Sequence, residues 1–172
     1  EYFNSFSNIT VKNKYMSGGS LYYLGKQYRL KIIEAKHEEV KLFRGFIYVY
    51  TKNKKDNEVI EKLLDSWYLE HAKKYFSKLL LKQYEKIRKY DVLLPELKVR
   101  KLAKRWGSCT KDSKIILNIE LIKVSSLCIE YVIMHELCHL KYYSHDKKYY
   151  DFLELLMPDW KKRKNKLENY WD

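Results

Sequence analysis

The stretch YVIMHELCHLKYYSH, from Tyr131 to His145, contains three of the five histidines of the chain and one glutamate. His135 and His139 are four residues apart, so on a helix with about 100° per residue they project from one face, one turn apart. Two imidazoles at this spacing can bind one metal ion, and Glu136 lies about 100° around the helix from His135. A carboxylate at that place can act as a base on a metal-activated water without being a ligand. The stretch therefore predicts a helix that carries a metal centre.

The third histidine decides whether this helix continues. In a continuous helix, His145 would point about 120° away from His139 and could not reach the same ion. We therefore predict that the helix ends at about Tyr143, that the chain bends there, and that Ser144 caps a new helix starting at His145. The bend would bring the third imidazole to the metal.

Three neutral imidazoles suit Zn²⁺, with Mn²⁺, Ni²⁺ or Co²⁺ as substitutes. Three protein ligands leave a fourth position for water or substrate, which is the arrangement of catalytic zinc sites. A purely structural metal is the alternative. Cys138 lies on the same helix, about 60° from the face of His139, and we interpret it as a small buried residue that is not a ligand.

The N-terminal part of the chain has the pattern of strands. Ser20–Ile33 is rich in aromatic and branched residues, and Glu38–Tyr50 consists of two short runs around Arg44-Gly45, which is typical of a hairpin. Apolar residues then recur at helical spacing, which predicts one long amphipathic helix from about Asn57 to Ile87. We expect antiparallel strands in residues 1–52, followed by this helix.

Residues 57–172 also predict a second hairpin and further helices. Leu97–Ala103 alternates as a strand, the segment RWGSCTKDS turns, and Lys114–Asn118 returns as the second strand. Ser125 or Ser126 can cap the histidine-bearing helix. The remaining helices are expected from His145 to about Met157, where Pro158 ends the helix, and in the basic segment through Leu167.

Composition indicates one α+β domain spanning residues 1–172. The chain has 172 residues, 46% of them hydrophobic, and contains no repeat or linker-like segment. It has no apolar run of the roughly 20 residues that span a bilayer, and its first residues lack the order of a signal peptide. Three cysteines without a CxxC pair suit a reducing compartment. We therefore expect a cytoplasmic monomer without a membrane partner.

The charge balance favours acidic partners. Lys and Arg outnumber Asp and Glu by 35 to 22, a formal net charge of +13. Such an excess favours nucleic acid or nucleotides as partners. Most of it is lysine along helix-like segments, which more often form solvated faces. The charge therefore leaves nucleic acid or nucleotide binding as an open alternative.

Five segments occur in an order that resembles one known family. They are RWGSCT (Arg105–Thr110), IILN (Ile115–Asn118), YVIMHELCHL, SHDKKYYDF and PDW (Pro158–Trp160). The order is similar to that of the YgjP-like metallopeptidases, also called DUF45, in which RWGSC precedes HELxH and a third histidine follows six residues later. The resemblance covers Ser17 to Leu167.

The resemblance implies a small zincin-like α+β domain, related to the SprT-like proteases, with a sheet beside the metal-bearing helix. It implies that the metal ligands are His135, His139 and His145, and that Glu136 is catalytic. The step of six residues to the third histidine is that of metzincins. However, Tyr142 stands where metzincins have a turning glycine, so the chain departs from that group.

Residues around these motifs are candidates for substrate binding. Arg105 could hold a phosphate or a carboxylate, because its planar guanidinium matches both. Either the Arg105–Cys109 turn or the Lys114–Asn118 strand could pair with an extended peptide, although Trp106 could equally pack in the core. Tyrosines near the metal could stabilise an oxyanion. The full candidate set is Arg105, Trp106, Gly107, Ser108, Asn118, Tyr143 and Tyr149, with Tyr142 as a further oxyanion candidate.

These observations predict a zinc-dependent metallopeptidase in which Glu136 is the general base toward a zinc-activated water. The same site could attack phosphorus, so a metal-dependent nucleoside triphosphate pyrophosphohydrolase, for example acting on UTP, is an alternative. No glycine-rich phosphate loop supports it. A third alternative is a basic nucleic-acid-associated module with a structural zinc, in which the loss of Glu136 would change nothing. The candidate partners are a peptide or protein substrate, a nucleotide and nucleic acid.

Overall fold

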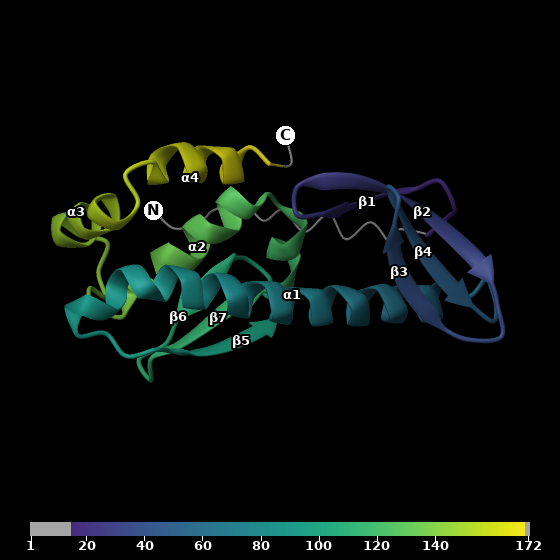
Figure 1. Cartoon of the computed structure of the whole chain (residues 1–172), viewed down its shortest axis with the longest axis horizontal. Helices are drawn as coiled ribbons and strands as arrows, with labels where there is room; N and C mark the ends of the chain where they lie inside the picture. Colours follow the sequence, from purple (N-terminus) through teal and green to yellow (C-terminus); the bar gives the residue numbers. More distant parts are fainter. Residues whose placement is uncertain (1–14, 171–172) are drawn as a thin grey trace.

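The long helix α1, Asn57–Ile87, extends along the molecule and forms a wall of both its halves (Figure 1). The computed structural model describes residues 15–170. Asp56 begins the helix, because its carboxylate accepts a hydrogen bond from the N–H of Val59 at 3.2 Å. Buried residues recur along it at helical spacing, from Ile60 to Ile87, and face the core. The predicted helix and its bounds are confirmed.

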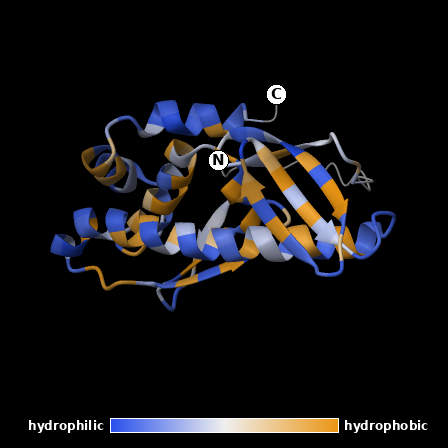
Figure 2. Cartoon of the chain, turned by 45° about the vertical axis from the view of Figure 1, so that its right-hand side comes forward, coloured by the Kyte–Doolittle hydropathy of each residue, from blue (hydrophilic) through white to orange (hydrophobic). Residues whose placement is uncertain are grey.

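A four-stranded sheet packs against the N-terminal half of α1 (Figures 1 and 2). Its strands are β1 (Ser20–Tyr23), β2 (Lys26–Glu34), β3 (Glu39–Phe43) and β4 (Phe46–Thr51), in the order β1-β2-β4-β3. The β1/β2 and β3/β4 pairs are antiparallel, but the central strands β2 and β4 are parallel. The prediction of antiparallel strands is wrong for this pair, because β4, whose Ile47 and Val49 are fully buried, takes the central position and leaves β3 at the edge.

The turn between β1 and β2 attaches this sheet to the other half of the molecule. The N–H groups of Leu24 and Gly25 donate hydrogen bonds to the carbonyls of Ile122 and Lys123, at 2.9 and 3.0 Å. A Cβ atom on Gly25 would lie 2.8 Å from the Cα of Ser125, and the φ angle of +78° also favours glycine. Glycine is therefore required at this contact.

The second sheet contains β5 (Glu96–Arg100), β6 (Gly107–Cys109) and β7 (Lys114–Asn118), in the order β5-β7-β6. Strands β5 and β7 are parallel, whereas β6 and β7 are antiparallel. The predicted hairpin between the first and the last strand is therefore wrong. The segment expected to turn itself contains β6, whose three residues are too few to show an alternating pattern.

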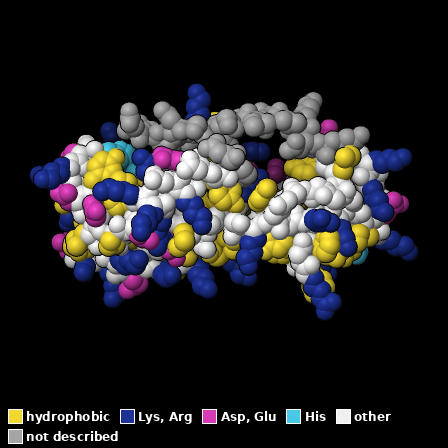
Figure 3. All heavy atoms as spheres, turned by 90° about the horizontal axis from the view of Figure 1, so that it is seen from above, with side chains coloured by type: hydrophobic (Ala, Val, Ile, Leu, Met, Phe, Trp, Pro, Cys, Tyr) yellow, Lys and Arg dark blue, Asp and Glu magenta, His cyan; other side chains and the backbone are white. Residues whose placement is uncertain are grey.

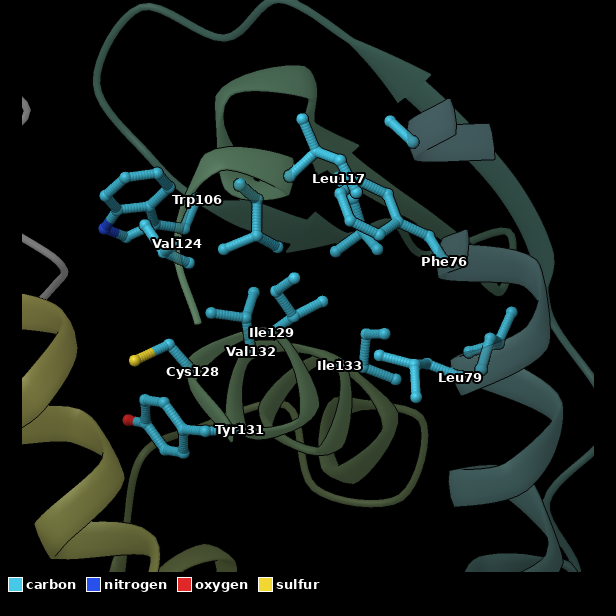
Figure 4. Packing of buried hydrophobic residues seen from close by; sticks show 14 of the residues in the cluster. Phe76, Leu79, Trp106, Leu117, Val124, Cys128, Ile129, Tyr131, Val132 and Ile133 are labelled. Atoms are coloured by element: carbon cyan, nitrogen blue, oxygen red, sulfur yellow. The ribbon is translucent and has the colours of Figure 1, made fainter. Parts of the chain in front are cut away.

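Helix α2 (Ser126–His139) lies at the centre of this half (Figure 4). It contacts α1, β6, β7, α3 (Lys147–Leu156) and α4 (Trp160–Glu168), and every residue from Tyr131 to Cys138 is buried. In Figure 4, Ile129 and Val132 face the side where Leu117 and Trp106 lie. Short 3₁₀ helices, η1 (Arg88–Tyr90) and η2 (Ile119–Lys123), complete the elements. The buried apolar residues form one cluster that extends over both halves.

Two surface properties complete the description. Lys and Arg side chains are spread over the face seen in Figure 3, with Asp and Glu between them. Among residues 15–170, none of the helices has the length and apolar character to cross a bilayer.

Glu130 links α2 to α1 and α4. Its carboxylate accepts hydrogen bonds from Arg163 of α4 at 2.7 Å and from Lys82 of α1 at 3.3 Å. Burial alone would raise the pKa of Glu130, but these two hydrogen bonds outweigh it and lower the pKa below its ordinary value of 4.5. The ionised form of Glu130 therefore stabilises the fold.

We expect Glu130→Gln to lower the free energy of unfolding at pH 7 by roughly 1 kcal/mol, since solvent screens the partly exposed pair. A depressed pKa stabilises the fold above the unfolded pKa and ceases to do so as pH falls through the folded pKa. The difference should thus shrink between pH 5 and pH 3 in urea unfolding. Glu154→Gln, at an exposed pair 3.8 Å from Lys161, is the control and should have no measurable effect. An equal deficit of Glu130→Gln at both pH values would contradict the assignment.

Candidate metal centre

The helix α2 places His135 and His139 on one face, one turn apart. His135 is buried and only 7% exposed, whereas His139, at the last residue of the helix, is partly exposed. Because the helix is enclosed by other elements, its backbone is held firmly and these two rings are fixed relative to the sheet.

The chain after α2 turns back and brings His145 to the same place. The helix ends at His139, four residues before the predicted end, and α3 begins at Lys147. Asp146 caps α3 by accepting a hydrogen bond from the N–H of Tyr149 at 3.0 Å, so the predictions of a Ser144 cap and of a helix start at His145 are wrong. No residue between 140 and 146 has a positive φ, so this bend needs no glycine.

The early end of α2 has a local cause. The Nδ1–H of His139 donates to the carbonyl of Tyr142 at 3.1 Å, while the N–H of Tyr142 donates to the carbonyl of Cys138 at 2.9 Å. These bonds hold the loop in a tight turn. The first also assigns the proton to Nδ1, so the lone pair of Nε2 is directed at the centre.

The three Nε2 atoms form a triangle with sides of 3.0, 3.1 and 3.3 Å. Zinc binds imidazole nitrogen at about 2.0–2.1 Å in tetrahedral geometry, which puts two nitrogens on one ion about 3.3 Å apart. The triangle therefore fits one tetrahedral ion with three histidine ligands. Within residues 15–170, one group of three or more potential ligand residues could hold a metal ion, and it consists of His135, His139 and His145.

The electrostatics suit metal binding as well. Burial lowers the pKa of all three histidines below the ordinary value of 6.5, most strongly for His135, where the neighbouring rings add to the effect. The rings are therefore neutral at pH 7, which is the form that binds a metal.

Tyr149 contacts all three histidines. This tyrosine is fully buried, and its hydroxyl donates to the backbone carbonyl of His135 at 3.0 Å. Its ring stacks on His139, with centroids 4.7 Å apart, and meets His145 edge to face at 4.8 Å. Tyr149 was a sequence candidate for substrate binding, but the structure places its hydroxyl against the α2 backbone.

Glu136 lies beside the histidines, 3% exposed, with its carboxylate at the wall of a cleft. Burial raises the pKa of Glu136 to about 8, although the charge of Arg105 and a hydrogen bond from the N–H of Cys109 oppose the shift. A carboxylate with a pKa near neutrality can both accept and return a proton.

The cleft has a volume of about 340 Å³ and brings together most of the residues predicted from sequence. It is lined by His135, Glu136, His139, His145, Lys104, Arg105, Gly107, Ser108, Cys109 and Tyr143. Sequence reasoning missed Lys104, next to the RWGSC segment, and considered Cys109 only as the end of the Arg105–Cys109 turn. Tyr143 is exposed and His145 is partly exposed, so the cleft opens to solvent.

Like Tyr149 and Tyr142, the sequence candidates Trp106 and Asn118 are not among the residues that line the cleft. Trp106 is only 7% exposed and packs in the core above α2, near Val124 (Figure 4). Asn118 is fully buried: its Nδ2 donates to the carbonyls of Leu102 and Arg105, both at 2.9 Å, and its backbone N–H donates to the carbonyl of Trp106 at 2.8 Å. The amide therefore fixes the loop that leads into β6 and the cleft.

Gly107 leaves room for Glu136. A Cβ atom at residue 107 would lie 3.0 Å from Cγ and Oε1 of Glu136 and 3.2 Å from Leu117, closer than such atoms normally approach. We expect Gly107→Ala to displace the carboxylate and to lower kcat/KM by about tenfold to a hundredfold, with the metal content unchanged. Steady-state kinetics and zinc analysis on one preparation would measure both.

Gly45→Ala provides the control for a general loss of stability. Gly45 has a φ of +84° and lies in the β3/β4 turn with no atom within 4 Å of the added Cβ. This control should reduce stability by about 1 kcal/mol without changing kcat/KM. Full activity of Gly107→Ala would show that the close approach to Glu136 does not matter.

The protein thus has an α+β fold with a candidate metal site. Two histidines and a glutamate on one helix, with a third histidine from the next loop, form the kind of cluster found in metal-dependent hydrolases. Residues 3–170 match the family model described as YgjP-like, metallopeptidase domain. The match covers nearly the whole chain, so the protein belongs to the YgjP-like metallopeptidase family, and its function is of the metal-dependent peptidase type. No curated protein matches the sequence.

Proposed function

We propose that the protein is a zinc-dependent peptidase that hydrolyses peptide bonds in the cleft beside α2. The observation that supports this most strongly is the convergence of three Nε2 atoms within 3.3 Å of one another, next to a buried carboxylate. His135, His139 and His145 would hold the ion. When bound, zinc supplies Lewis-acid chemistry to a water and to the substrate carbonyl.

Glu136 is the proton carrier in this proposal. Its carboxylate lies in the cleft wall but outside the triangle of nitrogens, so it can accept a proton from the attacking water and pass it to the leaving amine. The N–H of Cys109 and the space left by Gly107 keep the carboxylate in this position. Arg105 and Tyr143 line the cleft and are exposed, and in this proposal they contact the substrate.

The edge strand β6 offers a place for an extended peptide. The N–H of Asn118 donates to the carbonyl of Trp106, and the N–H of Thr110 donates to the carbonyl of Lys114. In an antiparallel pair, bonded and non-bonded residue pairs alternate, so the N–H and C=O of Gly107 point away from β7. A substrate strand could pair with this edge and lie across the cleft. The alternative that Lys114–Asn118 binds the peptide is wrong, because β7 is already paired on both sides.

A second candidate is hydrolysis of nucleoside triphosphates at the same site. Lys104 and Arg105 both line the cleft and could neutralise phosphate charge. Both chemistries use the same metal centre, so they differ in substrate and products. An assay for either must therefore identify the bond that is broken.

The deciding experiment gives zinc-loaded protein an unfolded protein substrate and, in parallel, the four nucleoside triphosphates, with products identified by mass spectrometry. Chelator-treated protein and the same protein after zinc is restored are the controls. We expect peptide products that disappear with chelation and return with zinc. Pyrophosphate and monophosphate with the same dependence would favour the second candidate, and no product from either substrate would contradict both.

A further inference from the structure

The face of the four-stranded sheet that points away from α1 carries a row of aromatic rings. Along β4, Ile47 and Val49 are fully buried, whereas Phe46, Tyr48 and Tyr50 alternate with them and are partly exposed. Side chains alternate between the two faces of a strand, so these three rings share the outer face. Among residues 15–170, they are not part of the packing around the hydrophobic core.

The rings follow one another in a regular line. The centroids of Phe46 and Tyr48 are 5.9 Å apart, and those of Tyr48 and Tyr50 are 6.3 Å apart with the planes inclined by only 18°. His37 continues the line, stacked on Tyr50 at 5.4 Å. The result is a short series of aromatic surfaces on a central strand of the sheet.

Basic side chains flank this line on both neighbouring strands. Strand pairing places Arg29 of β2 opposite Phe46, and Lys31 of β2 and Lys41 of β3 on either side of Tyr48. The Nζ atom of Lys31 lies 3.9 Å from the centroid of Phe46. We call these six residues, Phe46, Tyr48, Tyr50, Arg29, Lys31 and Lys41, the aromatic–cationic face.

Acidic residues reduce this charge only in part. Glu39, opposite Tyr50, pairs with Lys41 at 2.9 Å and lies 3.5 Å from His37. Arg29 and Lys31 have no acidic partner within ion-pair distance in the described part of the chain. The face thus keeps a positive charge, in a chain with a formal net charge of +13.

We propose that the aromatic–cationic face binds single-stranded nucleic acid. Proteins that bind single strands combine aromatic side chains, on which successive bases stack, with positive charge along the backbone. Four-stranded sheets can present two or three such aromatic side chains to RNA bases on the sheet surface. Here the rings lie in a line, so successive bases could stack on them while the single phosphate backbone follows the cations on one side of the line. The face is separate from the metal centre and does not depend on its activity.

The test measures binding of a fluorescent oligothymidylate to the full chain by anisotropy, at several salt concentrations. Tyr48→Ala and Tyr50→Ala should each weaken binding about fivefold to a hundredfold, as expected when a stacked base loses its ring. The double variant Lys31→Glu/Lys41→Glu should weaken binding and reduce the dependence on salt.

The matched control for charge is Lys74→Glu/Lys78→Glu, which changes the net charge equally at two exposed lysines of α1. It should leave the affinity within about twofold. Circular dichroism checks that each variant is folded. Vesicles of phosphatidylserine and phosphatidylcholine, tested in parallel, should bind weakly and without dependence on Tyr48.

Three results would overturn the proposal. Wild-type protein could fail to bind the oligonucleotide at low salt. The two charge variants could lose affinity equally, which would mean diffuse attraction without a defined site. Finally, vesicle binding could depend on Tyr48 while oligonucleotide binding does not, which would assign the face to an anionic membrane surface.

Discussion

Replacing Glu136 by Gln should lower peptide hydrolysis by about a hundredfold to ten-thousandfold while one zinc per chain stays bound. The substitution keeps the size of the side chain but removes its ability to accept a proton. The histidine triangle does not include this residue, so the metal should be retained. Kinetics, zinc analysis and urea unfolding on the same preparation would separate a lost proton transfer from a lost metal or a damaged fold.

Glu61→Gln, at an exposed position of α1, is the matched control and should keep full activity. Unchanged hydrolysis by Glu136→Gln would remove Glu136 from its proposed role. If the variant lost zinc together with activity, Glu136 would instead be needed to hold the metal.

His145→Ala should reduce zinc affinity about a hundredfold or more. Structural zinc sites contribute about 10–16 kcal/mol through their ligands together, so one ligand of a small set accounts for several kcal/mol. His145 lies in the loop between α2 and α3 and is partly exposed, so we expect the fold to remain. Competition with a chromophoric chelator would give the affinity, and circular dichroism would confirm the fold.

The comparison for this variant is His37→Ala, which removes an exposed histidine in the loop between β2 and β3. Its zinc content should equal that of the wild type. Zinc stoichiometry and affinity that stay unchanged in His145→Ala would exclude the three-histidine site.

The sequence pattern correctly predicted helix α1 and the histidine cluster, because both depend on the spacing of residues close together in the chain. Helix α1 spans 31 residues, long enough for its apolar pattern to set both ends, and Asp56 supplies the cap. Spacing also brought His135, His139 and His145 together correctly, since two of them share one helix face and the third needed only an interruption before it.

The errors concern interactions between distant parts of the chain. The parallel pairs β2/β4 and β5/β7 depend on which strand takes the centre of a sheet, and no local pattern encodes that choice. The exception is the early end of α2, which has a local cause: the ring of His139 donates to the carbonyl of Tyr142, three residues on, and an apolar pattern does not reveal such a side-chain hydrogen bond. The supporting roles of Asn118 and Tyr149 arise from contacts 13 to 16 residues away, which spacing within one element cannot show.

The length of α1 has a thermodynamic consequence. At about 1.5 Å per residue, its 31 residues extend about 46 Å, and the helix packs on the N-terminal sheet with one half and on α2 with the other. Because both halves share one continuous helix and one apolar cluster, we expect them to unfold cooperatively. A metal that binds only the folded chain stabilises that whole unit by mass action. The zinc concentration at the metal site would then raise or lower the free energy of unfolding of the sheet at the other end.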